Sequence, residues 1–230
     1  MAIALNGSPA SRVAIVTGGS RGVGQAAACR LASRGYIVVV NYLHDQRAAE
    51  LTVEAILAGN CEAVAVRADV ADDLDVKRLF AETIAAFGGV DVLVHTAGSH
   101  LTATPVTEAG LDEFDALIRI NTRATFVVNQ QAACHLRNGG AIVNLSSSAE
   151  SSSLRTYGLY AATKAITNVL TQALALELRE RDITVNAVSP AIHGPCIPDR
   201  VTDIIAYLLS DHGHRVTGQI LRVGDAELRP

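Results

Sequence analysis

Short runs of apolar, often β-branched residues alternate along this chain with longer stretches in which apolar residues recur every three or four positions. The short runs predict strands, and the longer stretches predict helices. The stretch from 72 to 87 has a clear helical pattern, with Val76, Leu79 and Phe80 on one face. Seven strands are predicted, at residues 12–17, 36–41, 62–68, 91–96, 140–146, 183–189 and 219–223.

The predicted strands are apolar at nearly every position rather than at alternate positions. This pattern is typical of parallel strands in a sheet that helices cover on both faces. Alternation of strand and helix, with right-handed crossovers, predicts a doubly wound α/β fold of the Rossmann type around a seven-stranded parallel sheet. No linker or change of composition divides residues 1–230, which are predicted to form a single domain. Such sheets bind ligands at the carboxyl ends of their strands.

The composition excludes several classes of protein. The chain has 230 residues, 49% hydrophobic and 18% charged, so it can bury a large core. Its formal net charge of −4, with interleaved signs, argues against nucleic acid as the main partner. The longest strongly apolar run, at 36–40, is too short to span a membrane, and the first residues do not resemble a signal peptide. Four scattered cysteines have no metal-binding spacing and are expected to be reduced thiols of a cytoplasmic protein.

The segment between the first predicted strand and the first predicted helix is rich in glycine. Gly18, Gly22 and Gly24 are spaced G-x-x-x-G-x-G, unlike the commoner G-x-G-x-x-G fingerprint of dinucleotide-binding proteins. Glycines in such a turn let the backbone approach a pyrophosphate at a helix N-terminus. The segment therefore predicts a dinucleotide site. The alternative is a tight turn without a ligand, which the flanking strand and helix make less attractive.

The end of the second predicted strand indicates which dinucleotide binds. NAD-specific sites usually have an acidic residue there for the ribose hydroxyls, but this chain has Asn41 and Tyr42. Asp45 lies further along and is expected to cap the next helix. Arg21, in the glycine segment, can pair with a 2′-phosphate through its guanidinium, and the alternative is a solvated arginine. The sequence thus favours NADP, with NAD as the alternative cofactor.

A tyrosine and a lysine lie together on a predicted helix. Tyr160 and Lys164 are four residues apart on one face, whereas Tyr157 has Ala161 at that spacing. A nearby ammonium lowers the pKa of a phenol, which makes Tyr160 the candidate general acid or base. Three serines at 146–148 end a predicted strand, where a hydroxyl can donate to a substrate carbonyl. Taken alone, the pair is also found on ordinary amphipathic helices, and the serines in ordinary turns.

Taken in order, these motifs resemble those of the short-chain dehydrogenases/reductases, in particular the ketoacyl reductases and glucose dehydrogenases. The resemblance spans nearly the whole chain and rests on TGGSRGVG (17–24), ADV (68–70), IN (120–121), NLSS (144–147), YAATK (160–164) and ITVNAVSP (183–190). It implies a catalytic tetrad of Asn121, Ser147, Tyr160 and Lys164. Tyr160 would protonate a carbonyl oxygen as hydride arrives, or the reverse, and Ser147 would hold that oxygen. Lys164 would lower the pKa of Tyr160 and hold the nicotinamide ribose, and Asn121 would position a water.

The resemblance also implies a set of cofactor-binding residues, with Asp69 against the adenine, and no metal. The set is Gly18, Ser20, Arg21, Gly22, Val23, Gly24, Asn41, Tyr42, Asp69, Val70, His95, Ala97, Gly98, Tyr160, Lys164, Pro190 and His193. One departure from the family lies within it, because the family's N-N-A-G reads H-T-A-G at 95–98. His95 is expected to be a structural substitute for asparagine rather than a second base.

The region after residue 189 departs further from the family. Pro195 replaces a threonine that holds the nicotinamide carboxamide, and the backbone of His193 aligns with that contact. Near 193–200 the substrate lid is shortened, because roughly two dozen residues that the family inserts are missing. Either the protein lacks most of the lid, or the sequence as given omits a stretch. A true truncation predicts an open site with poor exclusion of water.

These features predict an NADP-dependent oxidoreductase that acts on a small-molecule carbonyl or secondary alcohol. The alternative is a dinucleotide-binding protein with little catalysis, such as a redox-sensing regulator, which the short lid favours. The resemblance also implies a homotetramer built on the helices near 110–136 and 157–181 and on the C-terminal strand. A dimer is the alternative, because residues 222–230 differ from the family's usual end. Neither nucleic acid nor a membrane is an expected partner, and the substrate is not readable from the sequence.

Overall fold

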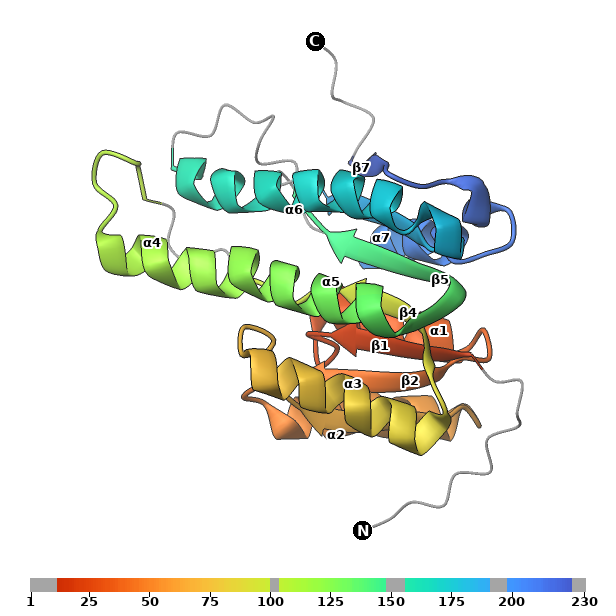
Figure 1. Ribbon diagram of the computed structural model, residues 1–230. Coiled ribbons are helices and arrows are strands. Elements are labelled where there is room, and N and C mark those ends of the chain that lie inside the picture. The colour runs from red at the N-terminus through yellow and green to blue at the C-terminus, as the bar shows by residue number, and fades with distance from the viewer. Residues whose placement is uncertain (1–11, 100–103, 148–155, 191–197, 225–230) are drawn as a thin grey trace.

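A parallel seven-stranded sheet forms the centre of the protein (Figure 1). The computed structural model describes residues 12–99, 104–147, 156–190 and 198–224. Within them the strand order is β3-β2-β1-β4-β5-β6-β7, which confirms the predicted doubly wound fold of the Rossmann type. The strands are β1 (Val13–Thr17), β2 (Ile37–Tyr42), β3 (Ala63–Arg67), β4 (Val90–His95), β5 (Leu136–Leu145), β6 (Thr184–Pro190) and β7 (Ile220–Val223).

Helices cover both faces of this sheet, as the uniformly apolar strands predicted. In Figure 1 the helices α3, α5 and α6 lie in front of the sheet. One face packs against α1 (Gly22–Ala32), α2 (Gln46–Ala58) and α7 (Pro198–Leu208). The other face packs against α3 (Asp73–Phe87), α5 (Ala124–His135) and α6 (Gly158–Glu177). No helix in the described part of the chain has both the length and the apolar character that a membrane span requires.

The helix α3 confirms the pattern predicted for 72–87. Asp72 begins it by accepting hydrogen bonds from the backbone N–H groups of Leu74 and Asp75, at 2.9 and 3.0 Å. Gly88 ends it with a φ of 77°, in the left-handed region that favours glycine. The predicted apolar face, including Phe80, is buried in the core. Local capping and the periodicity of apolar residues therefore agree at this helix.

Strand β5 begins earlier than the sequence predicted, at Leu136 rather than at residue 140. Leu136 pairs with Val90 of β4, and after a shift of register Ala141 pairs with Val92. Gly139 has a φ of 76° within this irregular stretch. The stretch contains polar residues and glycines, which do not have the apolar pattern of a strand, so the early pairing could not be predicted from local sequence.

The strand order reverses between β1 and β4. From β1 the chain continues to β2 and β3 on one side, whereas β5, β6 and β7 follow β4 on the other. The carboxyl ends of the two strands meet at the register pair of Thr17 and His95. A ligand-binding crevice is expected outside these ends, beside the segments that follow β1 and β4.

Candidate active site

A cavity of about 670 Å³ lies at the carboxyl edge of the sheet. Much of its wall is made of predicted cofactor residues, namely Gly18, Ser20, Arg21, Gly22, Val23, Gly24, Asn41, Tyr42, Val70, Ala97 and Gly98. The wall also includes residues that the sequence analysis did not assign to the site: Leu43, His44, Asp45, Ala68, Thr96, Ser99, Ile120 and Leu145. Several of these directly follow a strand or adjoin a predicted residue. Their position in the sequence could therefore have been used to predict that they line the site.

Three glycines of the wall are required by the shape of the backbone. Gly18 and Gly22 have φ values of 65° and 55°, which other residues rarely adopt. A Cβ atom on Gly24 would collide with the carbonyl oxygen of Gly18 and with the hydroxyl of Thr96. Open space adjoins Gly22, which lines the cavity. The glycine segment therefore lets the backbone come close to whatever the cavity holds.

The N-terminus of α1 faces this cavity through Gly22, Val23 and Gly24. Within the described ranges no side chain caps that terminus, whereas Asp45 caps α2 and Asp72 caps α3. The first N–H groups of a helix need acceptors, and their partial positive charge attracts anions. This terminus and the glycine segment together fit a dinucleotide pyrophosphate.

Arg21 and Asp45 face each other on the wall. Nη2 of Arg21 donates to Oδ2 of Asp45 at 3.2 Å, and the two side chains are 72% and 44% exposed. Asp45 also accepts a hydrogen bond from the N–H of Ala48, which confirms the predicted cap. Asn41 is buried, and its amide donates to the carbonyl of Ala68 at 3.0 Å. This amide therefore ties β2 to the end of β3.

Asp69, predicted to contact adenine, lies between two residues of the wall. Its carboxylate accepts hydrogen bonds from the N–H of Ala71 at 2.9 Å and from Nη2 of Arg119 at 2.6 Å. Burial acts to raise the pKa of Asp69, but these hydrogen bonds outweigh it and hold the pKa below its usual value. Asp69 is therefore a carboxylate at neutral pH. Arg119, which the sequence analysis missed, is a contact from a different part of the chain.

Asn121 is buried in η1 (Ile118–Arg123), a π-helical turn between α4 (Leu111–Leu117) and α5. Its Oδ1 accepts from the N–H of Ser99 at 2.9 Å. Its Nδ2 donates to the carbonyl of Ser99 at 2.8 Å and to the hydroxyl of Thr163 at 3.1 Å. A Cβ atom on Gly98 would crowd both Asn121 and the ammonium of Lys164. Asn121 thus lies beside Lys164, in a kind of turn that often marks functional sites.

The helix α6 carries Tyr160 and Lys164 one turn apart. Lys164 is buried, and its Nζ donates to the carbonyl of Leu145 at 3.0 Å. The same atom lies 5.9 Å from the centre of the Tyr160 ring. Burial lowers the pKa of Lys164 to about 8. The side chain of Ser147, just after β5, makes a hydrogen bond with Tyr160. The structure therefore brings all four residues of the predicted tetrad to one place.

The pKa of Tyr160 is raised, whereas the sequence analysis predicted that it is lowered. Burial raises it, and the hydrogen bond with Ser147 lowers it by less. The ammonium of Lys164 lies over the phenol ring. The predicted direction was wrong, because a sequence does not reveal how deeply a phenol is buried.

His95 is buried behind the cavity wall. Its Nδ1 makes a hydrogen bond of 2.8 Å with the hydroxyl of Thr17, and its Nε2 makes one of 3.2 Å with the hydroxyl of Thr125. Burial, and to a smaller degree the charge of Lys164, lowers the pKa of His95 to about 3. The ring is therefore neutral at physiological pH, as a structural residue would be.

The remaining predicted contacts lie around the end of β6. Pro190 is the last residue of that strand and pairs with Val223 of β7. His193 lies outside the described residues, as does most of the segment 193–200 predicted to form the shortened lid. The description resumes at Pro198, where α7 begins.

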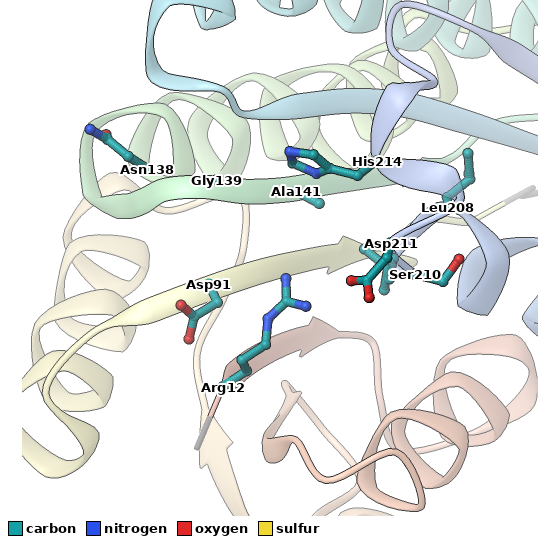
Figure 2. Close-up of a pocket in the computed structure, with 10 residues that line it drawn as sticks. Arg12, Asp91, Asn138, Gly139, Ala141, Leu208, Ser210, Asp211 and His214 are labelled. Atoms are coloured by element: carbon teal, nitrogen blue, oxygen red, sulfur yellow. The ribbon is translucent and has the colours of Figure 1, made fainter. Parts of the chain in front are cut away.

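A second cavity, of about 340 Å³, lies at the opposite, amino edge of the sheet (Figure 2). Its wall includes Arg12, just before β1, and Asp91, near the start of β4. Figure 2 also shows His214 and Asp211, which follow α7 in the sequence. None of the predicted site residues that the structure describes lines this cavity.

Known proteins resemble this chain in both sequence and fold. The family described as short chain dehydrogenase matches residues 12–197. The hydroxynaphthalene reductase-like protein Arp2 of Metarhizium majus is 40% identical over 184 residues, which cover 80% of this chain and 68% of that protein. A short chain dehydrogenase from Burkholderia cenocepacia, solved in complex with NADP, has a TM-score of 0.86 at 34% identity and covers 93% of this chain and 96% of its own. A blue fluorescent protein from a metagenomic library, solved with NADPH, has a TM-score of 0.85 at 33% identity, with the same coverage.

Proposed function

The chain belongs to the short-chain dehydrogenase/reductase family of NAD(P)-dependent oxidoreductases, and on this premise we propose that it transfers hydride between NADP and a carbonyl or secondary alcohol. The observation that carries the proposal is the meeting of Asn121, Ser147, Tyr160 and Lys164 beside a glycine-lined cavity. The cavity fits the cofactor because three glycines and an uncapped helix N-terminus adjoin it. When bound, NADPH supplies the hydride.

In this proposal Tyr160 is the group that exchanges the proton. The hydroxyl of Ser147 bonds to Tyr160, so both hydroxyls can donate to the same carbonyl oxygen of a substrate. With a pKa of about 8, Lys164 is mainly protonated at neutral pH, and its charge favours the phenolate that forms when Tyr160 gives up its proton. Lys164 also holds the nicotinamide ribose, and Asn121 positions a water beside it.

NADP is the proposed cofactor, with NAD as the weaker alternative. The end of β2 has Tyr42 and no acid at the position expected for NAD, and Arg21 lines the cavity nearby. Two structural relatives were solved with NADP or NADPH. Asp69 and Val70 form the adenine end of the site. Asp45 opposes the preference for NADP, because its carboxylate takes up the guanidinium that would bind a 2′-phosphate.

Hydroxynaphthalenes, reduced as their keto tautomers, and bicyclic ketones are the proposed substrate class, because the Metarhizium relative is named for hydroxynaphthalene reduction. The lid near 193–200 is proposed to be short. Strand β6 ends at Pro190 and α7 begins at Pro198, which leaves little chain to cover the site. An open site of this kind admits a rigid bicyclic substrate but excludes water poorly.

A homotetramer is the proposed assembly, with a dimer as the alternative. The helices α5 and α6 contact each other, and both lie in front of the sheet in Figure 1. Large apolar side chains on α4, α5 and α6 are exposed there, among them Leu111, Phe126, Val169 and Leu176. Such a surface is typical of an interface between copies of a chain. The cytoplasmic location expected from the sequence stays a prediction.

The decisive experiment compares Tyr160→Phe with Tyr157→Phe in a spectrophotometric assay of NADPH oxidation with hydroxynaphthalenones and simpler ketones. Loss of the proton donor should reduce kcat by about 100-fold or more, while the Kd for NADPH stays the same. Tyr157→Phe removes a neighbouring hydroxyl three residues away and should keep its activity.

If the unmodified protein binds NADPH but turns over nothing in a broad panel, the proposal fails. The dinucleotide-binding protein with little catalysis, which a short lid favours, then takes its place. Equal activity of the two phenylalanine variants would instead remove Tyr160 from the proton-transfer role while leaving the oxidoreductase assignment intact.

A further inference from the structure

Buried hydrogen bonds join the ends of β1 and β4 to the turn that carries Asn121. The hydroxyl of Thr17 bonds to Nδ1 of His95 at 2.8 Å, and Nε2 of His95 bonds to the hydroxyl of Thr125 at 3.2 Å. That hydroxyl in turn donates to the carbonyl of Asn121 at 2.5 Å. All four residues are buried. We refer to Thr17, His95, Thr125 and the Asn121 carbonyl as the His95 chain.

The direction of each hydrogen bond in this chain follows from its last member. A carbonyl can only accept, so the single hydroxyl proton of Thr125 points to Asn121. Thr125 must then accept from His95, which requires the proton to be on Nε2. Because the ring is neutral, Nδ1 carries no proton and accepts from Thr17. The His95 tautomer with its proton on Nε2 therefore satisfies every hydrogen bond from Thr17 to the Asn121 carbonyl.

The end of the His95 chain lies at an irregular point of the backbone. The N–H of Ala124 donates to the carbonyl of Arg119, five residues earlier, which is the spacing of a π-helix. Within this turn the side chain of Asn121 reaches Ser99 and Thr163. Side-chain partners commonly stabilise such interruptions of the α-helical ladder. Here Thr125 supplies one partner and His95 fixes its orientation.

We propose that His95 is a positioning residue, which through Thr125 holds the carbonyl of Asn121 and the π-turn in the arrangement that hydride transfer requires. The inference rests on the proposed function, since it gives the turn a task in that reaction. His95 itself exchanges no proton with the substrate. Burial, and to a smaller degree the charge of Lys164, keeps the imidazole neutral at physiological pH.

Thr125→Val tests the His95 chain, because valine has nearly the shape of threonine but lacks the hydroxyl that joins His95 to the Asn121 carbonyl. Thr171→Val is a matched control: the Thr171 hydroxyl also donates to the carbonyl four residues earlier, at 2.8 Å, and accepts from a buried side chain, Asn144, at 3.1 Å. Both threonines are buried. The two variants should therefore lose similar stability, whereas only Thr125→Val disturbs Asn121.

We expect kcat to fall about tenfold in Thr125→Val, with a nearly unchanged Kd for NADPH. Thr125→Ser, which restores the hydroxyl, should regain most of the activity, and Thr171→Val should keep it. Hydrogen exchange of the Ser99 amide, which donates to Oδ1 of Asn121, provides a readout that needs no turnover. Exchange should quicken in Thr125→Val but not in Thr171→Val.

Equal kcat values and equal Ser99 exchange in the two valine variants would overturn the inference. If the unmodified protein shows no turnover, only the proposed function fails. The hydrogen-exchange measurement then still decides whether the His95 chain holds the π-turn. His95→Gln retains a donor toward Thr125, so its pH profile should keep its shape. Loss of a limb of that profile would make His95 a proton-transfer group and would also overturn the proposal.

Discussion

The two edges of one sheet carry two cavities that differ in how their polar groups are satisfied. At the amino edge the protein satisfies them itself. Asp91 accepts from the N–H of Val13 at 2.7 Å and from Arg137 at 3.0 Å. Arg12 lies 5.1 Å from the centre of the Tyr36 ring, in cation–π geometry. Asp91 and Arg12 are therefore paired with groups of the protein itself, which is what a structural role requires.

The carboxyl edge instead has buried titratable side chains with shifted pKa values and a helix N-terminus without a side-chain cap. Burial lowers the pKa of Lys164 and raises that of Tyr160. The N-terminus of α1 has no side-chain cap within the described part of the chain, although two later helices are capped by aspartates. Perturbed pKa values cluster at functional sites because catalytic groups need pKa values matched to their task. Burial also raises the pKa of Tyr36 beside the amino-edge cavity, so the buried Lys164 ammonium and the uncapped helix distinguish the carboxyl edge as the candidate site.

The largest predicted effect is on the free energy of unfolding, and it comes from burial of the Lys164 ammonium. The folded pKa of Lys164 is about 8, and its unfolded value is 10.5. Between these values the unfolded chain binds a proton that the folded chain has released, so stability should rise with pH through this window. Relative to Lys164→Met, the unfolding free energy of the unmodified protein should rise by about 3 kcal/mol from pH 8 to 10.5.

Urea denaturation at a series of pH values measures this difference. Lys77→Met is the control, since Lys77 is the chain's other lysine and forms an exposed ion pair with Asp73. Relative to Lys77→Met, the unfolding free energy of the unmodified protein should not rise in this way from pH 8 to 10.5. Parallel curves for the unmodified protein and Lys164→Met would mean that the ammonium is solvated in the folded protein, and the contrast between the edges would lose its main support.

Two glycines offer a matched comparison of the edges. Gly22 at the carboxyl edge and Gly139 at the amino edge both have positive φ and open space where a Cβ atom would lie. Substitution by alanine should cost each site about 1–2 kcal/mol of backbone strain. Gly22→Ala puts a methyl group into the cavity proposed to hold the cofactor, whereas Gly139 lines the amino-edge cavity, so only Gly22→Ala should bind NADPH about tenfold more weakly.

Thermal denaturation and titration of NADPH fluorescence separate the two consequences. Similar losses of stability with unequal Kd values are the expected result. Equal Kd values would mean that the open space beside Gly22 is not occupied by the cofactor, and the pyrophosphate would have to bind elsewhere on the wall.

The fold was largely predictable, because strand burial and helix periodicity are recorded in local sequence. All seven strands form, and α3 begins and ends where its pattern predicted. The early start of β5 was missed because its first pair, Leu136 with Val90, precedes a polar irregular stretch. Pairing of this kind depends on the partner strand and leaves no periodic signal in its own sequence.

The candidate site was predictable as a set of residues but not as a set of environments. The order of the motifs predicted that Ser147, Tyr160 and Lys164 lie together, and in the structure these side chains are neighbours. Their burial, which sets the direction of the Tyr160 pKa, depends on packing across the fold. The link from His95 to Thr125 joins residues 30 positions apart, so a local motif does not reveal it. Burial and long-range hydrogen-bond partners could therefore not be predicted from the sequence.

The smallest predicted effect concerns the exposed ion pair at the rim of the carboxyl edge. Asp45→Asn removes the charge that occupies Arg21 but keeps an N-cap for α2, since asparagine caps as well as aspartate. Exposed pairs contribute about 0.2–1 kcal/mol, so the affinity for NADPH should rise by a factor of about 1.4 to 5. The affinity for NADH, which has no 2′-phosphate, should change little. Asp72→Asn makes the same exchange at the cap of α3 and should alter neither affinity. If Asp45→Asn strengthens both cofactors equally, Arg21 does not recognise the 2′-phosphate, and the preference for NADP must come from other residues of the wall.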